Sequence, residues 1–183
     1  MKDRNVVFVI FIVIATTLFS GCFEEDQPNQ NKKTETVSLK DLGLKTEDLP
    51  SGYMQYYTGF SYLSEFSNSS SESLVTWFIN GSISNLTESG LITCELNKFN
   101  ISSDAGQQFK KTIDYLISDR NFSIINGSIN RIGDESKGLE KEGFTDILAF
   151  RISNIIVVIS SPDYSITFNL AKIVEQRIKN SNN

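Results

Sequence analysis

Apolar and polar residues alternate along several parts of this chain in the way expected of β-strands. Between residues 91 and 99, Ile92, Cys94 and Leu96 alternate with polar neighbours, which predicts a strand with one buried face. The unbroken run Ile155–Ile159 predicts a central strand buried on both faces. Four further strands are expected, at Tyr53–Phe60, Leu74–Ile79, Phe122–Ile132 (with a turn signal at Asn126-Gly127) and Phe144–Ile152.

Two other segments carry apolar residues at helical spacing. One stripe runs from Ala105 through Phe109, Ile113 and Leu116, and the pattern predicts a helix over 105–117. A second stripe predicts a helix over 166–178, and residues 47–52 are expected to form a short helical turn. Residues 133–138 are rich in glycine and charge, which predicts a loop.

These elements predict an α+β fold, an antiparallel sheet with two amphipathic helices packed on one face. Their order suggests a βββα unit used twice. The five residues Ile79–Ile83 recur as Ile125–Ile129, which would fit such a duplication.

The first residues resemble a secretory signal peptide of the lipoprotein type. Lys2 and Arg4 precede an apolar run, Val6–Phe19, and Ser20 and Gly21 then lead to Cys22. The usual leucine three residues before the cysteine is replaced here by Phe19. We expect residues 1–21 to be removed and Cys22 to carry lipid, tethering the chain to the extracytoplasmic face of the cell membrane.

Two other fates fit the same residues. The uncharged stretch from Asn5 to Phe23 could serve as a retained transmembrane helix, or the chain could be secreted after simple cleavage. Each of these leaves the remainder outside the cytoplasm, because the basic residues precede the apolar run. Residues 22–38 are polar and predict a flexible tether, followed by a single globular domain over 39–180.

Composition excludes several classes of function. The net charge of −5 argues against nucleic acid as a partner, since phosphate binding needs clustered cations. The chain has no histidine, which excludes Ser-His-Asp and Cys-His catalysis and histidine-ligated metals. With Cys22 lipidated, Cys94 is the one remaining thiol, and its alternation predicts a buried, unreactive side chain. We therefore expect no metal, no cofactor and no enzyme activity.

Asparagine is frequent, and six N-x-S/T sequons occur, more than composition alone gives. They would suit a glycoprotein of an archaeal cell surface. The acceptor residues would be Asn68, Asn80, Asn85, Asn100, Asn121 and Asn126.

Two groups of residues are candidates for chemistry. Asp134 and Glu135 could act as paired carboxylates, but adjacent residues in extended chain point opposite ways. We interpret Gly133 and Asp134 as a structural turn in which the aspartate accepts backbone N–H bonds. The other group is aromatic and could form a binding platform or part of the sheet core; it consists of Tyr53, Tyr56, Tyr57, Phe60, Tyr62, Trp77 and Phe78.

Short motifs over residues 47–178 resemble those of uncharacterised surface-lipoprotein domains of bacteria and archaea, loosely of a PsbP/Mog1-like α/β fold. The motifs are Leu49-Pro50-Ser51-Gly52-Tyr53, Gly133-Asp134-Glu135-Ser136, Phe150-Arg151 with Asn154 before Ile155–Ile159, and the closing helix Ala171–Ile178. The resemblance implies no activity and makes Gly-Asp-Glu-Ser a structural turn, so no functional residue follows from it.

The sequence thus favours a non-catalytic, membrane-anchored module that binds a surface partner or ligand. One alternative is an extracytoplasmic enzyme using the carboxylates of Asp134 and Glu135. Another is an accessory subunit held by a retained transmembrane helix.

Overall fold

A computed structural model describes residues 37–59, 72–82, 90–125, 131–142 and 145–181, which belong to one compact unit, Thr36–Asn183. The signal sequence and Cys22 lie outside the described residues. The elements are α2 (Leu39–Leu42), η1 (Thr46–Asp48), β1 (Tyr53–Gly59), β2 (Glu72–Asn80), β3 (Leu91–Lys98), α4 (Ser102–Ser118), β4 (Ser123–Ile124), β5 (Glu135–Glu140), β6 (Asp146–Ile152), β7 (Ile155–Ser161) and α5 (Tyr164–Ser181).

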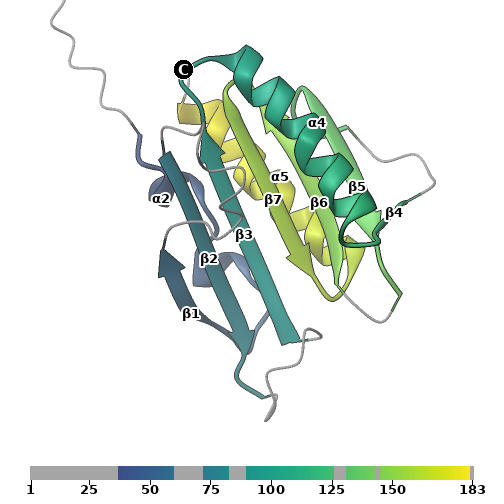
Figure 1. The fold of residues 1–183 in the computed structure, drawn as a ribbon. Helices are drawn as coiled ribbons and strands as arrows, with labels where there is room; N and C mark the ends of the chain where they lie inside the picture. The colour runs from purple at the N-terminus through teal and green to yellow at the C-terminus, as the bar shows by residue number, and fades with distance from the viewer. Residues whose placement is uncertain (1–36, 60–71, 83–89, 126–130, 143–144, 182–183) are drawn as a thin grey trace, which may run out of the picture. The chain divides into compact units, whose positions relative to one another are not determined.

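The strands form one antiparallel sheet in the order β1-β2-β3-β7-β6-β5-β4 (Figure 1). Strand β7 lies near the middle, and six of its seven residues are buried because helices cover both of its faces. This confirms the α+β class and the central position expected of Ile155–Ile159.

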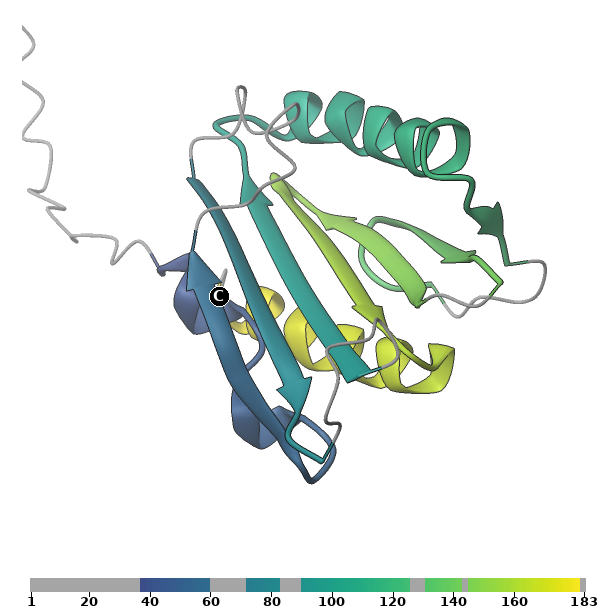
Figure 2. The ribbon, with the colours of Figure 1, turned by 60° about the horizontal axis from the view of Figure 1, so that its bottom comes forward.

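The two long helices lie on opposite faces of the sheet, with α4 on one side and α5 on the other (Figure 2). Cys94, Leu96 and Val157 pack with α5 and the short helix α2. Leu139, Ala149, Ile156 and Val158 pack with α4. The prediction that both helices pack on one face of the sheet is therefore wrong. Helical periodicity shows which side of a helix is buried, but it does not show on which face of the sheet the helix packs.

The placement of the helices also bears on the suggested duplication. A rotation that maps β1-β2-β3 onto β5-β6-β7 reverses both the strand order and the strand direction. Such a rotation has its axis perpendicular to the sheet and maps each face onto itself. The helix after the first three strands and the helix after the second three would then lie on the same face. Helices α4 and α5 lie on opposite faces, so the two βββα units are not related in this way.

Strand β5 was not predicted, since Glu135–Gly138 was expected to be loop. Glycine and charged residues have low strand propensity, and the pairing of β5 with β6 overrides it. Leu139 is fully buried against the α4 side and anchors the strand. Tertiary contacts, not local preference, make this segment a strand.

The segment before β1 is held against the last helix by one ion pair. Arg177 of α5 donates from both terminal nitrogens to the carboxylate of Asp48, over 2.7 and 2.8 Å, and also to the carbonyl of Gly43 over 2.7 Å. Asp48 in turn accepts the backbone N–H of Lys45. The bonds between Asp48 and Arg177 join residues that are 129 positions apart in sequence.

Among the helices of the described residues, none is long and apolar enough to cross a membrane.

Candidate functional site

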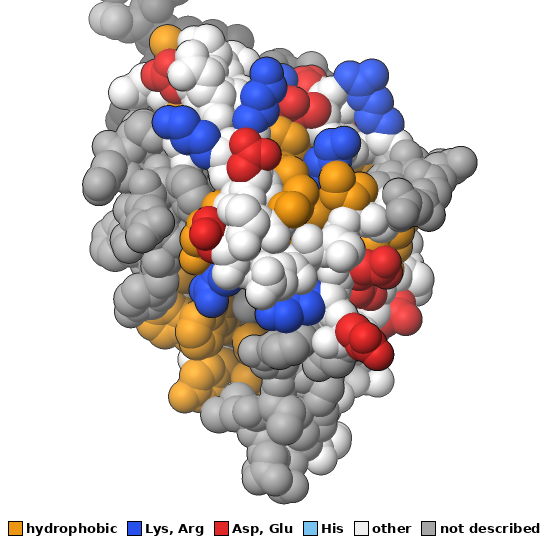
Figure 3. Space-filling view, turned by 45° about the vertical axis from the view of Figure 1, so that its right-hand side comes forward, with side chains coloured by type: hydrophobic (Ala, Val, Ile, Leu, Met, Phe, Trp, Pro, Cys, Tyr) orange, Lys and Arg blue, Asp and Glu red, His pale blue; other side chains and the backbone are white. Residues whose placement is uncertain are grey.

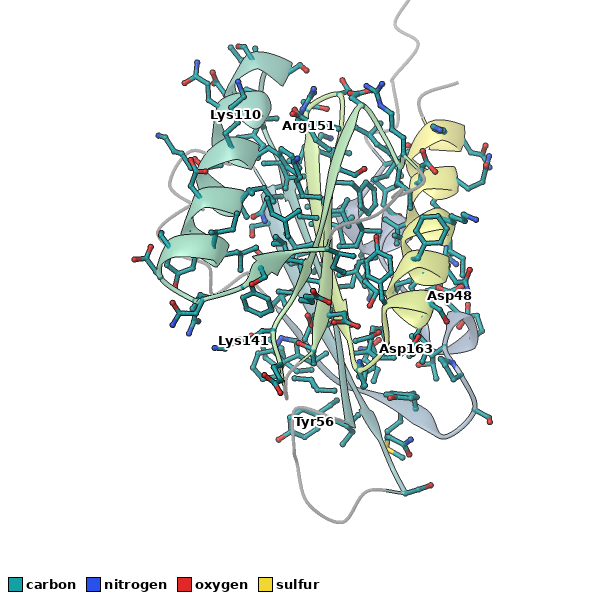
Figure 4. The ribbon with its side chains drawn as sticks, turned by 90° about the vertical axis from the view of Figure 1, so that its right-hand side faces the viewer. Asp48, Tyr56, Lys110, Lys141, Arg151 and Asp163 are labelled. Atoms are coloured by element: carbon teal, nitrogen blue, oxygen red, sulfur yellow. The ribbon has the colours of Figure 1, made fainter. Side chains whose placement is uncertain are left out.

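The acidic residues of the 133–135 segment converge on one guanidinium group. Arg151 of β6 donates from Nε to Glu135 over 2.5 Å and from Nη1 to Asp134 over 3.3 Å. Nη1 also donates to the carbonyl of Ser153 over 2.7 Å and to the hydroxyl of Ser102, at the start of α4. Figure 4 shows Arg151 at the end of the sheet near which α4 begins.

Gly133 and Asp134 form the turn that leads into this cluster. Gly133 has a φ of 65°, and a Cβ there would lie 2.3 Å from the carbonyl oxygen of Arg151, so only glycine fits. Asp134 accepts the N–H of Ser153 over 2.7 Å, and Ser153 itself has a φ of 53°. The carboxylate thus fixes a strained turn between β6 and β7.

The expectation that Asp134 and Glu135 point opposite ways is wrong, because both side chains reach Arg151. Asp134 precedes β5 and lies in the turn, where the strand alternation does not apply. Sequence reasoning also missed the role of Arg151, for which the only signal was a cation on a strand of mostly buried residues. Carboxylates held by a guanidinium and, for Asp134, by the backbone N–H of Ser153 suit a structural link better than proton transfer.

The aromatic residues divide between the two faces of the sheet. Phe78 is fully buried and Tyr53 packs against the same core, on the α5 side. Tyr57 pairs with Trp77 across β1 and β2, and their rings lie 5.6 Å apart on the α4 side. Phe60 and Tyr62 lie outside the described residues.

A bulge in β1 adds a second tyrosine to the α4 side. The register shifts between Gln55 and Tyr57, which leaves Tyr56 without a partner in β2. Tyr56 is 58% exposed, and Met54 is 52% exposed. Figure 4 places Tyr56 on the α4 side near one end of the sheet, and Figure 3 shows hydrophobic side chains gathered at that end.

The helix α4 lies mainly over β6 and β7, so it leaves this side of β1 and β2 without a helix in the described part of the chain. We call the α4 side of β1 and β2 the open face, and it continues onto β3 as far as the edge of α4. Its aromatic part is the pair Tyr57 and Trp77 with Tyr56 beside it.

Polar side chains of β3 are buried where the open face meets α4. Asn97 donates from Nδ2 to Glu95 over 2.8 Å and accepts from the hydroxyl of Ser73 over 2.7 Å. Glu95 is 7% exposed and Asn97 is 9% exposed. Gln108 of α4 is 8% exposed, and its Nε2 has no hydrogen-bond partner in the structure.

These polar groups surround a small cavity, lined also by Thr112 of α4 and by apolar side chains. Its volume is about 10 Å³, room for one water-sized group. The alternating pattern of residues 91–99 predicts that Glu95 and Asn97 lie on the exposed side of their strand. The structure buries them because the edge of α4 covers that side of β3.

Cys94 lies on the other face of β3 and is fully buried, as predicted. Burial raises the pKa of its thiol to about 12, so the reactive thiolate is absent at neutral pH. Within the described residues, no cluster of three or more His, Cys, Asp or Glu side chains could hold a metal ion.

Three of the six sequon asparagines belong to the described residues. Asn100 and Asn121 are exposed, and Asn80 is partly buried with its side-chain oxygen accepting the N–H of Ser82. Asn121 has a φ of 58°, a left-handed conformation that asparagine tolerates better than most residues after a helix. Asn68, Asn85 and Asn126 lie outside the described residues.

No protein-family model and no curated protein sequence matches this chain. Among solved structures, the chain is similar to a GTP binding regulator from Thermotoga maritima, with a TM-score of 0.44 and 16% identity. The match covers 77% of this chain and 87% of that one. A likeness this weak supports no conclusion about the function of this chain.

Proposed function

We propose that this chain is a non-catalytic binding module, anchored by lipid at Cys22 to the extracytoplasmic side of the membrane, and that it binds through the open face. The single observation that carries the proposal is the aromatic group Tyr56, Tyr57 and Trp77 beside a buried polar cavity on that face. Aromatic side chains next to a few buried polar groups are the usual composition of a ligand or partner site.

The location of the Asp134 and Glu135 carboxylates supports binding over catalysis. The carboxylates of Asp134 and Glu135 are both held by Arg151, at the end of the sheet near which α4 begins. They lie on β5 and the turn before it, and the open face lies on β1–β3 across β7 and β6. An enzyme that used these carboxylates would have to break the ion pairs first.

The anchoring part of the proposal rests on the Ser20-Gly21-Cys22 sequence after an apolar run. Intact-mass analysis of protein extracted from membranes should give a chain that begins at Cys22 with added lipid mass. The Cys22→Ser variant should keep its leader. A native chain that retains Lys2 and Arg4 would favour the transmembrane alternative.

The binding part can be tested by photo-crosslinking in the native host. A photoreactive phenylalanine analogue at Tyr56 should give a discrete crosslinked species, because this side chain stands at the edge of the open face. The same analogue at Lys172, on the outer side of α5, is the matched control and should give none. Equal crosslinking from both positions, or none from Tyr56, would contradict binding through the open face.

A further inference from the structure

Attachment of a glycan to asparagine depends on two side-chain groups of the N-x-S/T sequon. The amide nitrogen of the asparagine forms the bond to the sugar, and the serine or threonine hydroxyl two residues later completes the motif. A transferase that acts on the folded chain has to reach both groups. The three sequons within the described residues differ in whether these two groups are free.

The sequon Asn80-Gly81-Ser82 has its amide bound within the fold. The side-chain oxygen of Asn80 accepts the N–H of Ser82 over 3.0 Å, and the side chain is also hydrogen-bonded to the hydroxyl of Tyr53. Asn80 is the last residue of β2, is paired with Tyr53 of β1 and is only partly exposed. A glycan on Asn80 would have to displace these bonds.

The sequon Asn100-Ile101-Ser102 has an exposed asparagine, but its hydroxyl is bound. Ser102 donates to the carbonyl of Ser153 over 2.9 Å and accepts from Arg151 over 3.2 Å. Ser102 is also the first residue of α4, so this sequon leads into a helix and does not continue as an extended chain.

The sequon Asn121-Phe122-Ser123 presents both groups at the surface. Asn121 and Ser123 are exposed, and neither side chain has a hydrogen-bond partner among the residues that the structure describes. Phe122 between them is partly buried and packs against the core on the α4 side. The amide and the hydroxyl of this sequon are therefore both free, on either side of a residue that faces the core.

The end of α4 fixes this arrangement. The N–H of Phe122 donates to the carbonyl of Leu116 over 3.0 Å, and Asn121 has a left-handed φ of 58°. These are features of a Schellman helix end, in which the left-handed residue is usually glycine and sometimes asparagine. The helix end alone can account for an asparagine at position 121, so a test of glycosylation has to leave Asn121 in place.

We propose that Asn121 is a glycan attachment site and that it is used in preference to Asn80 and Asn100. In the transfer, the amide nitrogen of Asn121 attacks the anomeric carbon of a sugar held on a lipid phosphate. A carbon–nitrogen bond forms and the bond from that carbon to the phosphate oxygen breaks. The lipid phosphate leaves with the electron pair, and the amide proton passes to a base of the transferase. This inference rests on the extracytoplasmic location in the proposed function.

The attachment site lies near the sheet edge that is farther from the open face. Ser123 is the first residue of β4, which forms one edge of the sheet, whereas β1 forms the other edge (Figure 1). A glycan on Asn121 therefore begins away from Tyr56, Tyr57 and Trp77. Glycosylation at this position is compatible with binding through the open face.

The test measures the intact mass of the full chain purified from membranes of the native host. Ser123→Ala removes the sequon hydroxyl and leaves Asn121 in its turn, and Ser82→Ala makes the same change in the sequon of Asn80. We expect Ser123→Ala to lose the mass of one glycan in addition to the hydroxyl oxygen. Ser82→Ala, Asn100→Gln and Ser123→Thr, which keeps the sequon, should all retain the full glycan mass.

Two kinds of result would overturn the inference. One is an unmodified chain without a glycan, or a Ser123→Ala variant that carries the same added mass as the unmodified chain. The other is loss of a glycan in Ser82→Ala or Asn100→Gln, because the bonds of the folded chain would then not select the site. If the chain begins at a lipidated Cys22 and carries no glycan, the anchoring proposal stands and the assignment of Asn121 alone is wrong.

Discussion

At the scale of single residues, Arg151 connects three segments of the described part of the chain. Its guanidinium joins the turn before β5, the turn after β6 and the start of α4. Its side chain is only 16% exposed, so its bonds are partly shielded from water. Removing one partner leaves a partly buried cation with an incomplete set of acceptors.

This predicts that Asp134→Ala lowers the free energy of unfolding by about 1–2 kcal/mol, because both the Ser153 N–H and Arg151 lose an acceptor. Glu135→Gln should cost about 1 kcal/mol through its weakened bond to Arg151. Urea denaturation measures both. The control is Asp114→Ala on the exposed side of α4, and a change no larger than that of the control would contradict the role of Arg151.

Cys94 gives a prediction for alkaline pH. The pKa of its thiol rises from 9.0 to about 12 in the folded chain, mainly by burial. The unfolded chain therefore loses the proton first, and the thiol's contribution to stability, complete below about pH 9, declines as the pH rises towards 12.

Cys94→Ala should cost about 1 kcal/mol at pH 7 and make the alkaline decline shallower, in denaturation curves measured from pH 7 to 11. A native chain whose thiol reacts with a maleimide at pH 7 as fast as an unfolded one would contradict the burial of Cys94.

At the scale of elements, strands with β-branched or alternating residues were predictable, and Ile155–Ile159 is the clearest case. β5 was not predictable, because Glu135, Lys137 and Gly138 form a strand only through pairing with β6. The face of the sheet that each helix covers was not predictable either, because it depends on how the chain crosses the sheet after β3 and after β7. The burial of Glu95 and Asn97 depends on the same crossing.

The start of α5 has a capping aspartate that can be tested by pH. Asp163 accepts the N–H groups of Ser165 and Ile166 over 2.8 and 3.2 Å. The Ser165 hydroxyl and these two N–H groups lower the pKa of the Asp163 carboxyl. The charged form stabilises the fold, so its contribution is present at neutral pH and is lost as the pH falls through the lowered pKa.

Asp163→Ala should lower the melting temperature at pH 7. Asp163→Asn should lower it by less, since asparagine also caps helices. Both variants should show a weaker acid dependence than the unmodified chain between pH 5 and pH 2. Thermal denaturation followed by circular dichroism measures this, and an Asn variant as unstable as the Ala variant would contradict capping as the cause.

At the scale of the whole described unit, the sheet has two halves. Helices α4 and α5 cover β6 and β7 from both sides, while β1 and β2 have α2 and η1 on one side and the open face on the other. The ion pair of Asp48 and Arg177 holds the segment with α2 and η1 to α5. It therefore holds the first described residues of the chain to its last helix.

Arg177→Met should lower the free energy of unfolding by about 2 kcal/mol, because Asp48 is left partly buried without its cation. It should also speed proteolysis between residues 37 and 50. The control is Lys179→Met, which removes an exposed pair with Glu175 and should cost no more than about 0.5 kcal/mol. Equal losses in the two variants would contradict a special role for Arg177.

We propose that the open face lies outside the cytoplasm and is occupied there. The measurement is labelling of intact host cells by a membrane-impermeant maleimide, in a Cys94→Ala chain that carries either Tyr56→Cys or Lys111→Cys. Both positions are exposed in the structure, at the open face and on the outer side of α4.

We predict rapid labelling at position 111 in cells, slow labelling at position 56 in cells, and equally rapid labelling of both in the purified chain. If position 111 is protected in intact cells and reacts only after lysis, the chain is not extracytoplasmic. If both positions react equally fast in cells, the open face has no occupant and the claim fails.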